Sequence, residues 1–170
     1  HGGTNMLVTG VPKIDPVVGL CKQEVPLPTE WKCIQGKRTF LWNTWYSIDE
    51  SSLRFFDDIF EWFASHLDCA LIWRPHPMTD VITKLYSPKV YQQLQEHIQA
   101  VECAPNMVVD REVSFKPSFV YSDAQISDHS SMMHQYMLMD KPLLWFQNLS
   151  SSMTGEELIS CTWMERAKRV

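Results

Sequence analysis

The chain has 170 residues, a length that suits one domain with a buried core. Hydrophobic residues make up 45% and charged residues 21%, which is typical of a globular protein and excludes a disordered one. The net charge of −5 excludes a strongly basic protein of the kind that binds nucleic acid or anionic lipid, so an anionic ligand would need local groups.

The first 38 residues contain one predicted strand and one predicted short helix. Residues 6–9, MLVT, are apolar and are followed by Gly10, which predicts a strand that enters a tight turn. Asp15-Pro16 suits the start of a short helix, because Asp caps helices and Pro fits their first turn. Residues 22–38 carry two prolines and many charges and are expected to form a connecting loop.

A strand, a helix and a second strand are predicted next. Residues 39–44, TFLWNT, are rich in β-forming side chains and predict a buried strand. Apolar residues recur at helical spacing through SLRFFDDIFEWFASHL (52–67), with candidate caps at Asp49, Ser51 and Ser52. CALIW (69–73) is a continuous apolar run, typical of a parallel strand covered on both faces, and it stops at RPHP (74–77).

The second half of the chain continues the alternation of helices and strands. Alternation of this kind favours an α/β domain of three layers, with a mostly parallel sheet and helices on both faces. We expect a single domain over residues 4–170, with 1–3 outside it. The further predicted elements are helices at 88–101, 118–122, 130–139 and 155–169 and strands at 107–109, 124–127 and 142–146.

The cysteines argue for reduced thiols in a cytoplasmic protein. Their odd number and their scatter, without a CxxC pair, oppose both a disulfide framework and a zinc site, so we expect no metal. No apolar run approaches the roughly 18 residues of a membrane span, and no signal peptide is visible. The five cysteines are Cys21, Cys33, Cys69, Cys103 and Cys161.

Two polar motifs follow the carboxyl ends of predicted parallel strands, and such sheets bind ligands beyond these ends. In RPHP, prolines on both sides restrict the backbone of His76, which could donate to a phosphate, and the phosphate would favour the charged ring. Arg74 would supply a second cation. The structural alternative is a turn with an exposed imidazole, with Arg74 paired to an acid.

The second motif is SDHSS (127–131). If a helix begins at Ser130 or Ser131, its backbone N–H groups and the two hydroxyls form an anion site. The alternative is an ordinary N-cap made by a serine or by Asp128. His134 lies one turn further along this helix and either faces the same site or packs within the domain.

These motifs together resemble a known family. GVPKID (10–15), LWNTW (41–45), LIWRPHPM (71–78) and SDAQISDHSSMMHQYMLMDKPLLWF (122–146) occur in this order. They are similar to the C-terminal half of the CDP-glycerol glycerophosphotransferases, the teichoic-acid-type polymerases and primases. The resemblance implies a Rossmann-like domain that forms one half of a GT-B fold, with the active site in the cleft between two such domains. It spans nearly the whole chain.

The resemblance also implies roles for individual residues. His76 would contact the donor diphosphate as a catalytic group, with Arg74 beside it, and Ser130 and Ser131 would bind phosphate oxygens. The cleft and nucleotide side would be lined by Gly10, Lys13, Asp128, His129 and His134.

Three departures from the family pattern leave the identity of the donor open. His129 stands where an aromatic residue usually precedes Ser-Ser. His134 and Gln135 stand where an acid often holds the ribose hydroxyls. The motif similar to PTWR reads NTWY, so Tyr46 replaces its arginine.

The expected function is transfer of glycerol phosphate, or of a similar polyol phosphate, from a CDP-activated donor to a hydroxyl acceptor. The acceptor would be a lipid-linked or cell-wall glycopolymer, reached through an N-terminal half that this chain lacks. We expect no cofactor besides the donor, weak nucleotide binding without turnover by this chain alone, and a peripheral position at the inner membrane face. The alternatives are a GT-B glycosyltransferase or sialyltransferase, a UDP-sugar 2-epimerase, and a non-enzymatic interaction module with a vestigial phosphate site.

Overall fold

The computed structural model describes residues 12–47, 51–146 and 168–169. These residues form a six-stranded parallel sheet in the order β3-β2-β1-β4-β5-β6. The strands are β1 (Arg38–Asn43), β2 (Cys69–Arg74), β3 (Met107–Val109), β4 (Ala124–Ser127), β5 (Leu143–Trp145) and β6 (Lys168–Arg169). The α/β, Rossmann-like fold class predicted from the sequence is therefore confirmed.

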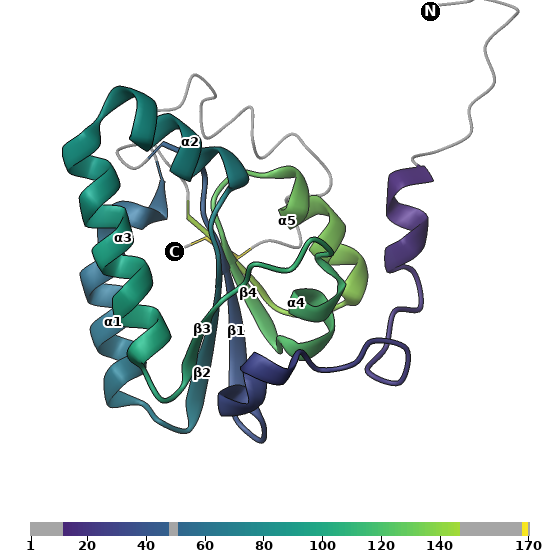
Figure 1. Cartoon of the computed structure of the whole chain (residues 1–170). Coiled ribbons are helices and arrows are strands. Elements are labelled where there is room, and N and C mark those ends of the chain that lie inside the picture. Colours follow the sequence, from purple (N-terminus) through teal and green to yellow (C-terminus); the bar gives the residue numbers. More distant parts are fainter. Residues whose placement is uncertain (1–11, 48–50, 147–167, 170) are drawn as a thin grey trace, which may run out of the picture.

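Helices cover both faces of the sheet, as Figure 1 shows. α1 (Phe56–Ser65) and α3 (Pro88–Cys103) lie on one face, and α4 (Lys116–Tyr121) and α5 (Ser131–Tyr136) lie on the other. α2 (Pro77–Tyr86) lies across the top of the sheet in this view. Four short 3-10 helices complete the described elements: η1 (Pro12–Val17), η2 (Thr29–Ile34), η3 (Ser52–Phe55) and η4 (Met137–Met139).

The core consists of two clusters, one on each face of the sheet, as expected for a parallel sheet that is buried on both faces. Leu41 and Ile72 point toward the α4–α5 layer, whereas Trp42 and Trp73 point toward α1 and α3. The Trp42 and Trp73 rings stack with centroids 5.5 Å apart. Alternation along β1 and β2 thus supplies apolar side chains to both layers.

The structure differs from the predicted elements in several places. Helix α2 is absent from the predicted elements, and the loop expected at 22–38 contains η2, whose Trp31 is buried. The helix predicted at 52–67 is divided into η3 and α1, and the one at 130–139 into α5 and η4. The helix predicted at 155–169 is wrong at its end, because residues 168–169 form β6.

Most of that last segment, and the strand predicted at 6–9, lie outside the described residues. In the part of the chain that the structure does describe, no helix combines the length and the apolar character needed to cross a bilayer.

Candidate functional site

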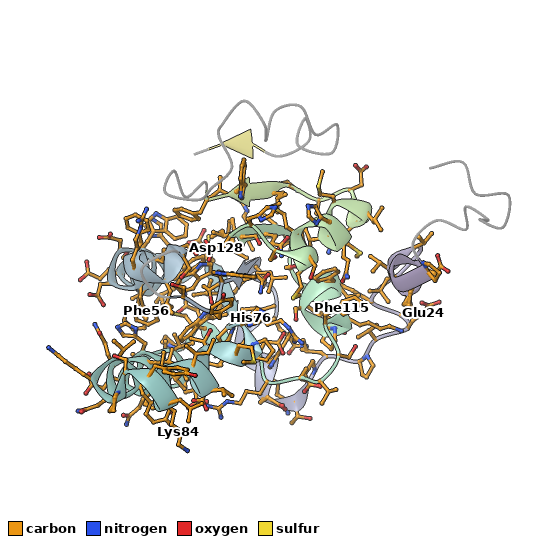
Figure 2. The ribbon with its side chains drawn as sticks, turned by 90° about the horizontal axis from the view of Figure 1, so that it is seen from above. Glu24, Phe56, His76, Lys84, Phe115 and Asp128 are labelled. Atoms are coloured by element: carbon orange, nitrogen blue, oxygen red, sulfur yellow. The ribbon has the colours of Figure 1, made fainter. Side chains whose placement is uncertain are left out.

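The strand order reverses between β1 and β4, and this switch point gathers the motifs. From β1, the strands β2 and β3 are added in order toward one edge of the sheet. The strands β4, β5 and β6 are added in order toward the other edge, and all six are parallel. Ligands of open α/β sheets bind in the crevice beyond the carboxyl ends of the strands at such a point. Figure 2, seen from above, shows His76 and Asp128 near the centre, between the two helical layers.

His76 is the N-cap of α2. Its Nδ1 accepts a hydrogen bond from the backbone N–H of Met78 at 3.1 Å, and Pro77 occupies the first helical position. An imidazole that accepts at Nδ1 carries its proton on Nε2, so Nε2–H is the donor that His76 offers to a ligand. Burial of the ring lowers the pKa of His76, which favours this neutral form.

Two aromatic rings flank His76 on the side of β1. The ring centroids of Trp45 and Tyr46 lie 5.3 and 5.6 Å from that of the imidazole, and all three side chains are half-buried. Tyr46 therefore lies beside His76 at the position where the family pattern has an arginine. This places a flat apolar surface, not a cation, beside the histidine.

Arg74 forms an ion pair with a buried acid. Its Nη1 lies 2.6 Å from Oδ2 of Asp110, whose side chain is completely buried while that of Arg74 is 16% exposed. Asp110 also accepts from the Ser118 hydroxyl and from the backbone N–H of Glu112. The pairing that the sequence left as an alternative is thus present, and a contact between Arg74 and phosphate stays a prediction.

A cavity of about 320 Å³ opens beside Arg74 and Asp110. Its walls come from the RPHP segment, the start of α2, the middle of α3 and the end of β3. Arg74, His76, Asp110 and Glu112 contribute polar groups, and Leu94 is among the apolar residues of the lining.

Ser130 is the N-cap of α5. Its Oγ accepts from the backbone N–H of Met133 at 3.3 Å and donates to Oδ1 of Asn43 at 2.9 Å. The ordinary N-cap reading of SDHSS therefore holds for the Ser130 hydroxyl, whose proton points to Asn43. The neighbouring Ser131 side chain is exposed, which makes it the more accessible hydroxyl of the pair.

Asp128 anchors the segment that follows β1. Asp128 is 4% exposed, and its carboxylate accepts from the backbone N–H groups of Trp45 at 2.7 Å and Ser52 at 2.8 Å. Burial raises the pKa of Asp128, and the two backbone hydrogen bonds oppose that shift. Backbone N–H groups of the protein thus occupy the Asp128 carboxylate, and these hydrogen bonds orient the loop that carries Trp45.

The remaining predicted site residues lie around this centre or outside the described part. The His129 ring is exposed and the His134 ring half-buried, with centroids 6.0 Å apart. Burial, followed by the charge of His129, lowers the pKa of His134. Gly10 and the Lys13 side chain lie outside the described residues, so their place in a cleft stays a prediction.

Sequence reasoning missed Asn43 and Asp110, which hold neighbouring segments together at the carboxyl ends of the strands. Each is a polar residue directly at the carboxyl end of an apolar strand, and that position was the available signal. Within the described ranges, no group of three or more His, Cys, Asp and Glu side chains is arranged to hold a metal ion.

Several solved structures are similar to this chain. The S. aureus MnaA–UDP structure superposes with a TM-score of 0.54 at 14% identity, covering 75% of this chain and 33% of that chain. At this identity the likeness shows the fold alone. No match was found among curated proteins.

The wall teichoic acid polymerase TagF is also similar, with a TM-score of 0.41 at 19% identity over 78% of this chain and 28% of TagF. A TagF variant soaked with CDPG gives 0.42 at 17% identity, over 73% of this chain and 25% of that one. The chain therefore spans about a third or less of each of these proteins.

The family comparison agrees with the resemblance seen in the motifs. The model of the CDP-Glycerol:Poly(glycerophosphate) glycerophosphotransferases matches residues 2–149, which include β1 to β5 and both polar motifs. By this match the chain belongs to the CDP-Glycerol:Poly(glycerophosphate) glycerophosphotransferase family.

Proposed function

We propose that this chain is the donor-binding domain of a transferase that uses a CDP-activated glycerol phosphate or a similar polyol phosphate. The carrying observation is His76, which follows β2 and lies beside the residues that follow β1, next to the switch point. Its Nδ1 is held by its own helix, so Nε2–H is its donor. The family membership and the fold support this assignment. The rest of the active site, including the acceptor site, would come from a second GT-B half.

In the proposed reaction an acceptor hydroxyl oxygen attacks the β-phosphorus of the donor. A new P–O bond forms, the bond between that phosphorus and the bridging oxygen breaks, and CMP leaves with the bonding electron pair. The hydroxyl proton passes to a base, which we assign to the second half. Nε2–H of His76 donates to a diphosphate oxygen and stabilises the charge that grows on the leaving group.

The Ser131 hydroxyl is the proposed second donor to the diphosphate. Ser130 acts through its N-cap and its backbone, because its hydroxyl proton is directed to Asn43. Arg74, whose charge is balanced by Asp110 on the cavity wall, is proposed to contact the diphosphate through its remaining guanidinium N–H groups. His129, His134, Gly10 and Lys13 are proposed to line the nucleotide side and the inter-domain cleft. In a full-length enzyme the acceptor would be lipid-linked or a cell-wall glycopolymer, at the inner membrane face.

Two substitutions at His76 separate its capping role from its role toward the ligand. His76→Asn keeps a strong N-cap acceptor but removes the imidazole, whereas His76→Ala removes both. We expect His76→Ala to lose about 1 kcal/mol of stability and His76→Asn to lose little. Both should lose CDP binding, measured by calorimetric titration of the folded proteins.

The outcomes of this titration separate the rival functions. If His76→Asn binds CDP as the wild type does, His76 is only a cap and the proposal is wrong. Preference for UDP over CDP would favour an enzyme that uses another nucleotide sugar as its donor. Tyr46, in place of the arginine of the family pattern, leaves this alternative open. A folded wild type that binds neither nucleotide would support the interaction module.

A further inference from the structure

Asn43 occupies the centre of the switch point. It is the last residue of β1 and pairs in register with Arg74 of β2 on one side and with Ser127 of β4 on the other. Its side chain is almost completely buried, at 3% exposure. Burying an amide group costs free energy unless its polar ends are hydrogen-bonded, so the partners of Asn43 are informative.

Both ends of the Asn43 amide are used. Nδ2 donates to the backbone oxygen of Arg74 at 3.2 Å, and Oδ1 accepts from the Ser130 hydroxyl at 2.9 Å. The partners fix this orientation, because a carbonyl oxygen can only accept. The Ser130 hydroxyl already accepts from the N–H of Met133, so its proton is available to Oδ1.

One side chain therefore joins the two polar motifs. Arg74 begins RPHP two residues before His76, and Ser130 caps the helix that starts with Ser131. The first motif follows β2 and the second follows β4, so their spacing is set across β1, where Asn43 lies. A ligand that contacts His76 and Ser131 together needs that spacing to be fixed before it binds.

We propose that Asn43 is a positioning residue that holds His76 and Ser131 at the separation required to bind one diphosphate. This inference rests on the proposed function. It makes Asn43 part of the donor site without contact to the donor. It predicts that losing the amide weakens the contributions of both motifs together.

The first test measures CDP affinity by calorimetry. Asn43→Ala should weaken CDP binding on the order of tenfold, by analogy with the effect of losing a hydrogen-bonding group that orients a metal ligand. Ser130→Ala removes one of the two bonds and should cost less. Because both changes break the same link, the double variant should bind no more weakly than Asn43→Ala.

Asn106→Ala is the matched control. Asn106 is also a buried asparagine, at 0% exposure, and its Nδ2 donates to the backbone oxygens of Phe63 and Cys69. It precedes β3 and so lies at the amino end of the parallel strands, whereas Asn43 lies at their carboxyl end. Asn106→Ala should lower the melting temperature and leave CDP affinity unchanged. If both asparagine variants weaken CDP binding equally, Asn43 acts only through stability and the inference is wrong.

A second measurement needs no ligand. In NMR spectra of the ligand-free protein, Asn43→Ala should shift both the His76 ring resonances and the Ser131 amide resonance, and Asn106→Ala should shift neither. If either signal stays in place in Asn43→Ala, the link between the motifs does not exist and the inference is overturned. If Asn43→Ala shows both shifts but the wild type binds no CDP, the result would instead contradict the proposed function.

Discussion

The Asp128→Ala substitution tests whether one buried carboxylate holds the loop after β1. It would leave two backbone N–H groups without their acceptor, those of Trp45 and Ser52. An unsatisfied buried donor costs roughly 1–3 kcal/mol. Ser52 is buried and should be at the upper end of this range, whereas Trp45 is half-buried and can be partly solvated. Removing the carboxylate also removes its own burial cost, so we expect a net loss of about 2–3 kcal/mol.

Urea unfolding at neutral pH measures this loss, with the midpoint and slope fitted together. Asp123→Ala is the matched control, because Asp123 lies just before β4 as Asp128 lies just after it. Asp123 accepts one backbone N–H, that of Thr39, at 2.8 Å, but its side chain is exposed and water can replace it. A loss for Asp128→Ala no greater than that for Asp123→Ala would refute the anchoring role.

Three further predictions concern Asp128, Trp31 and Arg74. Burial raises the pKa of Asp128 above its ordinary 3.8, so the folded state holds this proton more tightly than the unfolded state does. The contribution of Asp128 to the stability of the fold is therefore fully present below pH 3.8 and falls as the pH rises through the raised pKa. The stability difference between wild type and Asp128→Ala should thus be larger near about pH 4 than near neutral pH, and the reverse trend in urea titrations would contradict this. Trp31→Ala should cost about 3–5 kcal/mol in the same assay, because the ring is 1% exposed, and a loss typical of a loop residue would show that η2 is not part of the core. Arg74→Met should cost about 3 kcal/mol by leaving the buried Asp110 carboxylate unpaired, and a neutral result would mean that Ser118 and the Glu112 N–H suffice to hold it.

The strands could be predicted from the sequence because their patterns are local. CALIW is apolar at every position, and the structure buries all five of its residues in β2. The strands predicted at 39–44, 107–109, 124–127 and 142–146 are confirmed within one residue at each end. Once these strands alternate with helices, the parallel sheet and its ligand-binding edge follow.

Helix α2 escaped prediction because its pattern is reversed. Its buried side chains are Thr79 and Thr83, whereas Met78, Val81 and Leu85 are exposed. A search for a buried apolar stripe therefore finds nothing there. The prolines of RPHP indicate a restricted backbone around His76 and, as the alternative, a turn, although Pro at the first helical position is equally a start signal.

The network around Asn43 could not be predicted, because its partners are far apart in sequence. Asn43 and Ser130 are separated by 87 positions, and Asn43 and Arg74 by 31. Their contacts depend on β1 lying between β2 and β4, which no local pattern specifies. Local signals located the two motifs, and the sheet order showed which residue joins them.

The most direct test of the central claim is a calorimetric titration of this chain with CDP-glycerol, CDP, UDP and inorganic phosphate, repeated with His76→Asn. The proposed function predicts that cytidine nucleotides bind best and that His76→Asn stays folded but loses this binding. Equal binding by wild type and His76→Asn, or a clear preference for UDP, would contradict a CDP-donor site at His76.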